Sequence, residues 1–271
     1  MPVEVAVPTL LQQIRGHRVD EGHWTAQIDR DWWSWAGPHG GLLTALNLHA
    51  AMDTAPGMAP RALSVRFHGP SDDSLLDVHS SEERPGASTA IVTTETRQGG
   101  RTVLSMLTTM TAGRSGPSVQ HAQPPIAAPP EQCEPLELPV EFVPFGQHVE
   151  IRPVGGALPL SGSDVAEMRA WLRLKPSIPF TAPVAAVLVD ALAPGIFPRL
   201  TEPVAVPTVE LSVHFHADLE AEPIDDYVLA IQRNVSCSDG WCIDETELWS
   251  PDGRLLVQGR QLRRILGDPD L

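Results

Sequence analysis

Residues 181–192 have the sequence TAPVAAVLVDAL, an almost wholly apolar run with a single carboxylate, Asp190. Thr181 is a candidate N-cap, and Pro183 suits the first helical turn, where its missing N–H costs nothing. A helix that is apolar on nearly every side is buried. We therefore predict a buried central helix around which the rest of the chain is arranged.

Asp190 is the unusual residue of this helix. A charge on a buried helix is costly unless it is paired, hydrogen-bonded or neutralised. Taken alone, the stretch is equally compatible with an Asp turned to solvent at a fraying C-terminal end and with a functional carboxylate. The rest of the chain must therefore supply partners if Asp190 is to be functional.

The segments around this helix alternate between apolar and polar residues, as half-buried strands do. Residues 209–215 show the alternation most clearly, with Val209, Leu211, Val213 and Phe215 on one face. In this half of the chain we predict strands at 145–152, 168–174, 209–215, 227–231, 241–249 and 254–265.

The first half of the chain has a similar arrangement. We predict a short helix near 10–14, a strand at 23–28, a turn rich in Gly and Pro at 37–41, and an apolar helix at 42–52. Strands follow at 63–67, 75–81, 88–97 and 101–111, and turns at 84–86 and 98–100 join them as hairpins.

The two halves repeat. The sequence SVRFH at 64–68 is similar to SVHFH at 212–216, an offset of 148 residues. A repeat of that length indicates a domain duplication and not a solenoid. We predict an α+β fold with an N-terminal domain at 1–113, a proline-rich linker at 114–139 and a C-terminal domain at 140–271. Each domain would wrap a curved antiparallel sheet around one apolar helix.

The composition limits the possible partners. The 271 residues carry a formal net charge of −15, which argues against nucleic acid and against an anionic membrane surface. We expect no signal peptide and no membrane span. Three cysteines, with Cys237 and Cys242 too far apart for a C-x-x-C pair, suggest neither a disulfide framework nor a metal knuckle. We therefore predict a cytoplasmic protein without a metal or another cofactor.

Several of these segments resemble the double-hotdog acyl-CoA thioesterases of the acyl-CoA thioesterase II type. The resemblance rests on HGGLL at 39–43, LSVRFHGP at 63–70, and the order of Asp190, Thr208 and Gln261. It implies a double hotdog with one continuous sheet, and hydrolysis of acyl-CoA to a free acid and CoA. In the family, the matching Asp, Thr and Gln bind and activate the hydrolytic water. The loop at 193–199 departs from the family pattern.

Thioester hydrolysis needs an activated water, a polarised carbonyl and a place for the thiolate. An ionised carboxylate in an apolar setting is a stronger base, and Thr208 and Gln261 would hold the water by hydrogen bonds. Gln261 shares a strand face with Val257 and Gly259, which predicts that it points toward the central helix. The alternatives are an ordinary strand residue at Thr208 and an outward-facing Gln261, since Leu262 lies on the other face.

Substrate binding is predicted at His39, Gly40 and Gly41, where the glycines let the backbone approach a ligand closely. This turn resembles that of the single-hotdog phenylacetyl-CoA-type thioesterases, which carry an acid on the helix about two turns further on. Here the helix offers Asn47, Leu48 and His49 in that region, so we predict one functional site per chain.

Two further groups of residues have alternative interpretations. The aromatic patch at 32–35 packs in the core and between subunits, or it forms the wall of an acyl pocket, with Trp35 as a substrate-binding residue. The last strand ends with Arg260, Arg263 and Arg264, which contact CoA phosphates or are simply solvated.

Two other functions remain open besides hydrolysis. One is a non-catalytic protein that binds acyl-CoA. The other is a hotdog enoyl-CoA hydratase, although the Asn-Pro motif with Asp and His that such enzymes carry is missing here. In either case the predicted partner is acyl-CoA. The exposed edge strand of a hotdog sheet further predicts a homo-oligomer, a dimer or higher.

Overall fold

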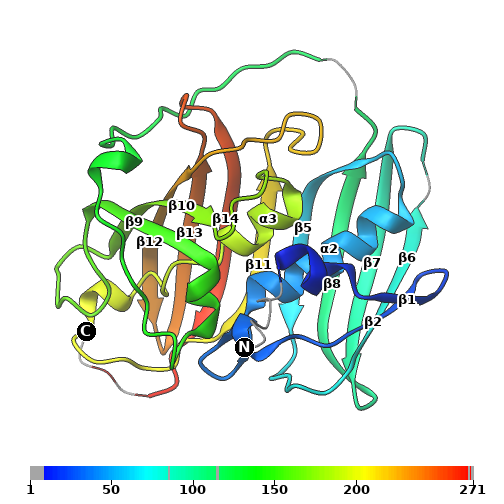
Figure 1. Cartoon of the computed structure of the whole chain (residues 1–271), viewed down its shortest axis with the longest axis horizontal. Helices are drawn as coiled ribbons and strands as arrows, with labels where there is room; N and C mark the ends of the chain where they lie inside the picture. Colours follow the sequence, from blue (N-terminus) through cyan, green and yellow to red (C-terminus); the bar gives the residue numbers. More distant parts are fainter. Residues whose placement is uncertain (1–8, 85, 114–115, 268, 270–271) are drawn as a thin grey trace, which may run out of the picture.

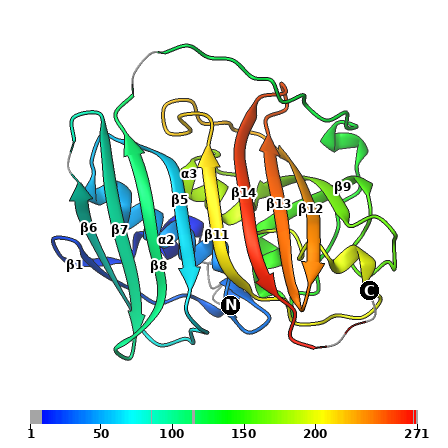
Figure 2. The ribbon, with the colours of Figure 1, turned by 180° about the vertical axis from the view of Figure 1, so that it is seen from behind.

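A computed structural model describes residues 9–84, 86–113, 116–267 and 269 of the chain. One antiparallel sheet of 12 strands crosses the whole molecule, in the order β1-β2-β6-β7-β8-β5-β11-β14-β13-β12-β10-β9. Both central helices, α2 and α3, lie on the same face of this sheet (Figure 1), and the opposite view shows the strands in front of them (Figure 2). The predicted α+β architecture with one continuous sheet is confirmed.

The elements follow the predicted order in both halves. The first half contains α1 (Leu10–Arg15), β1 (His17–Asp20), β2 (His23–Ala26), η1 (Arg30–Trp32), β3 (Trp33–Ser34), β4 (Gly37–Pro38), α2 (Gly40–Thr54), β5 (Ala59–Phe67), β6 (Leu76–Arg84), β7 (Thr89–Gln98) and β8 (Arg101–Thr111). The second contains η2 (Pro130–Gln132), η3 (Pro144–His148), β9 (Val149–Gly156), β10 (Glu167–Leu174), α3 (Ala182–Leu188), η4 (Phe197–Arg199), β11 (Thr208–Phe215), β12 (Val228–Ser238), β13 (Trp241–Trp249) and β14 (Leu255–Arg264).

The centre of the sheet is the antiparallel pair of β5 and β11, in which Ser64 lies opposite Ser212. These are the two residues that the sequence repeat makes equivalent. An approximate two-fold axis therefore passes through this pair and relates the halves. The strand registers then assign a first-half counterpart to each residue of the second-half strands.

The main hydrophobic core lies between the sheet and the two helices. Leu42 and Leu46 of α2, Val187 of α3, and Val65 and Val213 of the central strands belong to one buried cluster. Burial of this apolar surface is the main contribution to stability, and the alternation in the strands directs it to one face of the sheet.

The central helix is shorter than predicted. It ends at Leu188, so Asp190 lies in the turn just beyond it. Beyond Leu188 the backbone makes 3-10 bonds instead, from the N–H of Asp190 to the carbonyl of Val187 at 3.2 Å and from that of Ala191 to the carbonyl of Leu188 at 3.3 Å.

Thr181 is the N-cap residue and Pro183 lies in the first turn, as predicted. The side chain of Thr181 makes no capping hydrogen bond, and the Glu220 carboxylate accepts the N–H of Ala182 at 2.9 Å instead.

Two other local predictions are wrong. The strand predicted from residue 145 begins only at Val149, because Pro144 opens a 3-10 turn before it. A disulfide joins Cys237 and Cys242. The two cysteines lie opposite each other in the hairpin of β12 and β13, so strand pairing brings together residues that are five apart in sequence. The cysteine argument for a reducing compartment therefore loses its basis.

The segment between the halves packs on the outer face of the second half. Residues 116–129 contain neither helix nor strand. The indole N–H of Trp171 donates to the carbonyl of Ala128 at 2.8 Å, and Cys133 joins a buried cluster with Leu229 and Trp249. This cluster lies on the side of the sheet away from the helices, because neighbouring residues of β12 alternate between the two clusters.

A cluster of charged residues ties the edge strands of the second half together. The carboxylate of Glu150 pairs with Arg152 at 2.7 Å and with Arg173 at 2.8 Å. Burial alone would raise the pKa of Glu150, but hydrogen bonds from Tyr227, Arg173 and Arg152 outweigh it and lower the pKa from 4.5 to about 2. A carboxyl group with a lowered pKa stabilises the fold above its unfolded value, and this contribution is lost as the pH falls toward the folded value.

We expect Glu150→Gln to lower the free energy of unfolding at pH 7 by about 1–2 kcal/mol, less than the full shift implies because the site is partly open to solvent. The difference from wild type should shrink as the pH falls from about 4.5 toward 2. Urea unfolding across this range is the measurement. As a control, Glu210→Gln removes an exposed pair with Arg66 and should change stability by about 0.5 kcal/mol or less. A pH-independent difference for Glu150→Gln would contradict the assignment.

Candidate active site

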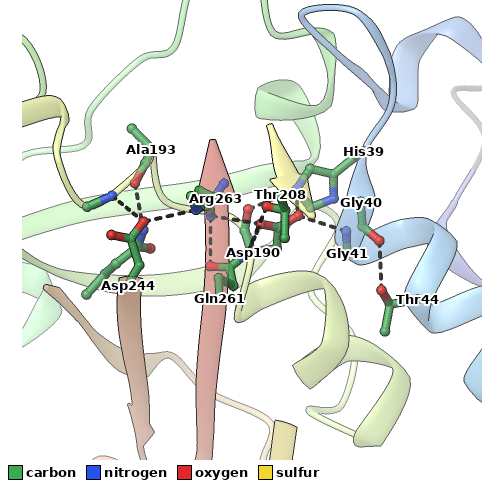
Figure 3. A network of polar contacts seen from close by, with 12 residues as sticks. His39, Gly40, Gly41, Thr44, Asp190, Ala193, Thr208, Asp244, Gln261 and Arg263 are labelled. Carbon is green, nitrogen blue, oxygen red and sulfur yellow. Dashed lines mark hydrogen bonds and ion pairs between the residues drawn. The ribbon is translucent and has the colours of Figure 1, made fainter. Parts of the chain in front are cut away.

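Asp190 is the centre of a polar network at the junction of the two halves (Figure 3). One carboxylate oxygen, Oδ2, accepts the backbone N–H of Gly41 at 2.9 Å, and the other, Oδ1, accepts Nε2 of Gln261 at 2.7 Å. The Gln261 Nε2 also lies 3.2 Å from Thr208 Oγ1, to which it donates. The structure thus brings Asp190, Thr208 and Gln261 together from the end of α3, the start of β11 and the middle of β14.

The first half contributes its glycine turn to this network. The N-terminus of α2 meets the C-terminal end of α3, and the helices approach so closely that side chains have no room. A Cβ at Gly40 would lie 2.9 Å from Asp190 Oδ2, and one at Gly41 would lie 2.7 Å from the carbonyl oxygen of Ala186. The glycines are therefore required for the contact between the halves, whatever else they do.

His39 holds the backbone of Asp190 in place. Its Nδ1 accepts the N–H of Leu42 at 3.3 Å, so the ring proton resides on Nε2, which donates to the carbonyl oxygen of Asp190 at 3.0 Å. Burial lowers the pKa of His39, against the opposing effect of Asp190, which keeps the imidazole neutral. The ring is buried and stacks on Phe145. Substrate binding by His39 stays a prediction.

Arg263 is the first residue that sequence reasoning misplaced. Its side chain is only 6% exposed, and its guanidinium lies 3.2 Å from Asp190 Oδ1 and 2.7 Å from Gln261 Oε1. The CoA-phosphate interpretation is therefore wrong for Arg263, and so is the expected apolar setting of Asp190. Strand alternation was the available signal, because Arg263 lies on the same face of β14 as Gln261.

Asp244 is the second unforeseen residue. It is 1% exposed, and its Oδ2 lies 2.9 Å from Nε of Arg263 in an ion pair. The same carboxylate accepts the N–H of Gly195 at 2.9 Å and Nδ2 of Asn234 at 2.8 Å. Asp244 faces Gln261 across the pair of β13 and β14, and it fixes the loop that departs from the family pattern.

The tryptophan patch divides into two environments. Trp32 is buried and stacks on His148 at a centroid distance of 4.0 Å, which matches the packing interpretation. Trp35 is exposed, and its ring lies 6.1 Å from that of Phe197 in the loop that Asp244 fixes. Trp35 is therefore the member of the patch that a ligand can reach, and its role in binding stays a prediction.

The strand registers identify the first-half residues that are equivalent to the residues of the polar network. The counterparts of Thr208, Gln261, Arg263 and Asp244 are Pro60, Thr108, Met110 and Val92. A cavity of about 690 Å³ lies near these residues, between the C-terminal part of α2 and the start of α3, and is lined by residues that include His49 and Thr181. It is at the opposite ends of the helices from Asp190. The polar network therefore occurs once in the two-fold arrangement.

No helix among the described residues is long and apolar enough to cross a membrane. Within residues 9–84, 86–113, 116–267 and 269, no group of three or more His, Cys, Asp or Glu side chains is arranged to hold a metal ion.

Comparison with known proteins gives the family. The model of the acyl-CoA thioesterase N-terminal domain matches residues 29–111, and that of the C-terminal domain matches residues 130–265. A search of the curated proteins found no match.

Solved structures agree over nearly the full length. A hot dog fold protein from Alicyclobacillus acidocaldarius is 25% identical, with a TM-score of 0.88 over 97% of this chain and 100% of that one. The tesB protein of Mycobacterium avium subspecies paratuberculosis is 18% identical, with a TM-score of 0.80 over 95% and 98%. The acyl-CoA thioesterase II TesB2 of Mycobacterium marinum is 17% identical, with a TM-score of 0.76 over 96% and 99%. The fold is a double hotdog, and the chain belongs to the acyl-CoA thioesterase family.

Proposed function

We propose that this protein hydrolyses acyl-CoA thioesters to a free acid and CoA through a water activated by Asp190. The observation that carries the proposal is the contact among three side chains: the Asp190 carboxylate, the Gln261 amide and the Thr208 hydroxyl. Family membership supplies the reaction class, because both halves of the chain match thioesterase domains.

The hydrogen bonds give each side chain a direction. Thr208 Oγ1 accepts from Gln261, so the hydroxyl proton is left to donate to the oxygen of the water. Asp190 removes a proton from that water as general base, and the water oxygen attacks the thioester carbonyl. The tetrahedral intermediate then collapses, the carbon–sulfur bond breaks, and the CoA thiolate takes up the proton.

The glycine turn would bind the reacting end of the substrate. Gly40 opens α2, where the helix dipole is positive, so its N–H is the candidate donor to the developing oxyanion. In this proposal Gly41 and His39 hold the Asp190 carboxylate and backbone, and Trp35 borders the entrance.

Thiol release from a series of acyl-CoA substrates of increasing chain length tests the proposal. We expect CoA and the free acid to appear in equal amounts for at least one chain length. Binding of acyl-CoA without CoA release would instead support a non-catalytic binding protein. Hydration of an enoyl-CoA without CoA release would support a hydratase.

The remaining expectations belong to the same proposal. We infer a role in fatty-acid and lipid metabolism, acyl-CoA as the partner, and a homo-oligomer of two or more chains. The cytoplasmic location stays an expectation from the sequence, and the cysteines no longer support it. The division into domains at residues 1–113 and 140–271 with a linker at 114–139 also stays a prediction.

A further inference from the structure

We propose that Arg263, set in place by Asp244, is a positioning residue that fixes the orientation of the Gln261 amide and holds the Asp190 carboxylate against it. This inference rests on the proposed hydrolysis, because Arg263 would act through Asp190 and Gln261 and not on the substrate itself. Its basis is the geometry of four buried side chains from three elements.

The first step is the orientation of Gln261. Arg263 can only donate hydrogen bonds, and it donates to Gln261 Oε1 at 2.7 Å. The amide nitrogen is thereby turned to Asp190 Oδ1, at 2.7 Å, and to Thr208 Oγ1, at 3.2 Å. A flipped amide would place a donor against the guanidinium and an acceptor against the carboxylate. Arg263 therefore determines that Thr208 accepts from Gln261 and keeps its own proton for the water.

The second step is the charge of the site. The Arg263 guanidinium lies between two carboxylates, those of Asp190 and Asp244, and all three side chains are at least nine-tenths buried. The other titratable group facing Asp190 is His39, which is neutral. The positive charge of Arg263 holds the Asp190 carboxylate in place beside the Gln261 amide. Asp244 balances the single positive charge of Arg263. The formal charge of the three side chains together is therefore negative, and that charge belongs to Asp190.

The first half of the chain shows that packing alone does not require Arg263 and Asp244. The equivalent positions in the first half, Met110 and Val92, are apolar and fully buried. The fold therefore accepts an apolar pair at this place in the sheet. The charged pair occurs only in the half that also has Thr208 and Gln261, beside the Asp190 carboxylate. A purely structural role would not require that coincidence.

The test compares the double variant Arg263→Met/Asp244→Val with wild type and with Arg263→Lys. The double variant introduces the residues that the first half carries and leaves neither buried charge of the pair behind. We expect kcat to fall by about 10–100-fold with KM changed by about threefold or less.

Arg263→Lys retains the positive charge but not the planar fork that reaches both Asp244 and Gln261. We expect its kcat to fall as well, with KM near the wild-type value. A structural role predicts a different result, namely rates in both variants that are scaled only by the folded fraction from circular dichroism. That result would overturn the inference.

A readout independent of turnover is the side-chain amide of Gln261, assigned by NMR through its loss in Gln261→Glu. Its protons should exchange slowly with solvent in wild type and at least tenfold faster in the double variant. Unchanged exchange would overturn the positioning role. If wild type releases no CoA, the proposed function fails, and the amide exchange still decides whether Arg263 positions Gln261.

Discussion

Asp190→Asn is expected to lower kcat/KM for acyl-CoA hydrolysis by about 10²–10⁴-fold, the usual contribution of a well-placed general base. The amide cannot take a proton from water, so the step that generates the nucleophile is lost. Gly40, Gly41 and Trp35 would remain, and KM should change much less than kcat. Thiol release under saturating and limiting acyl-CoA separates the two constants.

Stability must be measured beside activity, because Asp190 also accepts hydrogen bonds. Its two oxygens take those of Gly41, Gln261 and Arg263, whereas an Asn has a single acceptor oxygen. We expect a loss of about 1–3 kcal/mol in unfolding free energy, which leaves a folded protein to assay. Asp53→Asn, an exposed residue near the end of α2, is the matched control and should keep the wild-type rate. An Asp190→Asn protein within about threefold of the wild-type rate would refute the base assignment.

The sequence predicted most of the sheet because strand alternation is a local property. The strands at 101–111 and 241–249 match β8 and β13 at both ends. The apolar run at 181–192 also identified the buried helix and drew attention to Asp190. These predictions depend only on which face of an element is apolar, and a buried core imposes that pattern on every strand that lines it.

Features that depend on pairing between distant segments were missed. The ion pair of Arg263 with Asp244 requires the register of β13 on β14, and the disulfide requires that of β12 on β13. The carbonyl of Asp190, just beyond α3, is bound by His39, which is 151 residues away in the chain. No local pattern contains such registers. The resemblance to a family was what brought Asp190, Thr208 and Gln261 together before their contact was known.

The polar network around Asp190 takes residues from both hotdog halves. The carboxylate comes from the second half, and the N–H that holds it comes from the first. Apolar residues at the first-half positions do not disturb the network around Asp190, provided that α2 and α3 stay in contact. The contact of α2 with α3 is therefore as important to the proposed activity as the side chains themselves.

Gly41→Ala tests that contact, and we expect it to lower the free energy of unfolding by about 2–4 kcal/mol. The new Cβ would lie 2.7 Å from the carbonyl oxygen of Ala186 and 2.9 Å from that of Val187, and both are backbone atoms that cannot rotate away. The helices must separate, which also weakens the hydrogen bond from Gly41 to Asp190. We therefore expect kcat/KM to fall at least about tenfold in the fraction that remains folded.

The sign of the change in unfolding free energy distinguishes a close helix contact at Gly41 from an open position. In an open helical position, Ala is more favourable than Gly by roughly 0.5–1 kcal/mol, so a site without the close approach would gain stability. Gly69→Ala, in the bend after β5, is the control for an added methyl group without a close contact, because the nearest heavy atom to its Cβ is Arg101 NH1 at 4.0 Å. Urea unfolding of both variants gives the comparison. Equal stabilities for Gly41→Ala and wild type would mean that α2 and α3 are not pressed together at Gly41, and the site would then lack the backbone donor that holds its carboxylate.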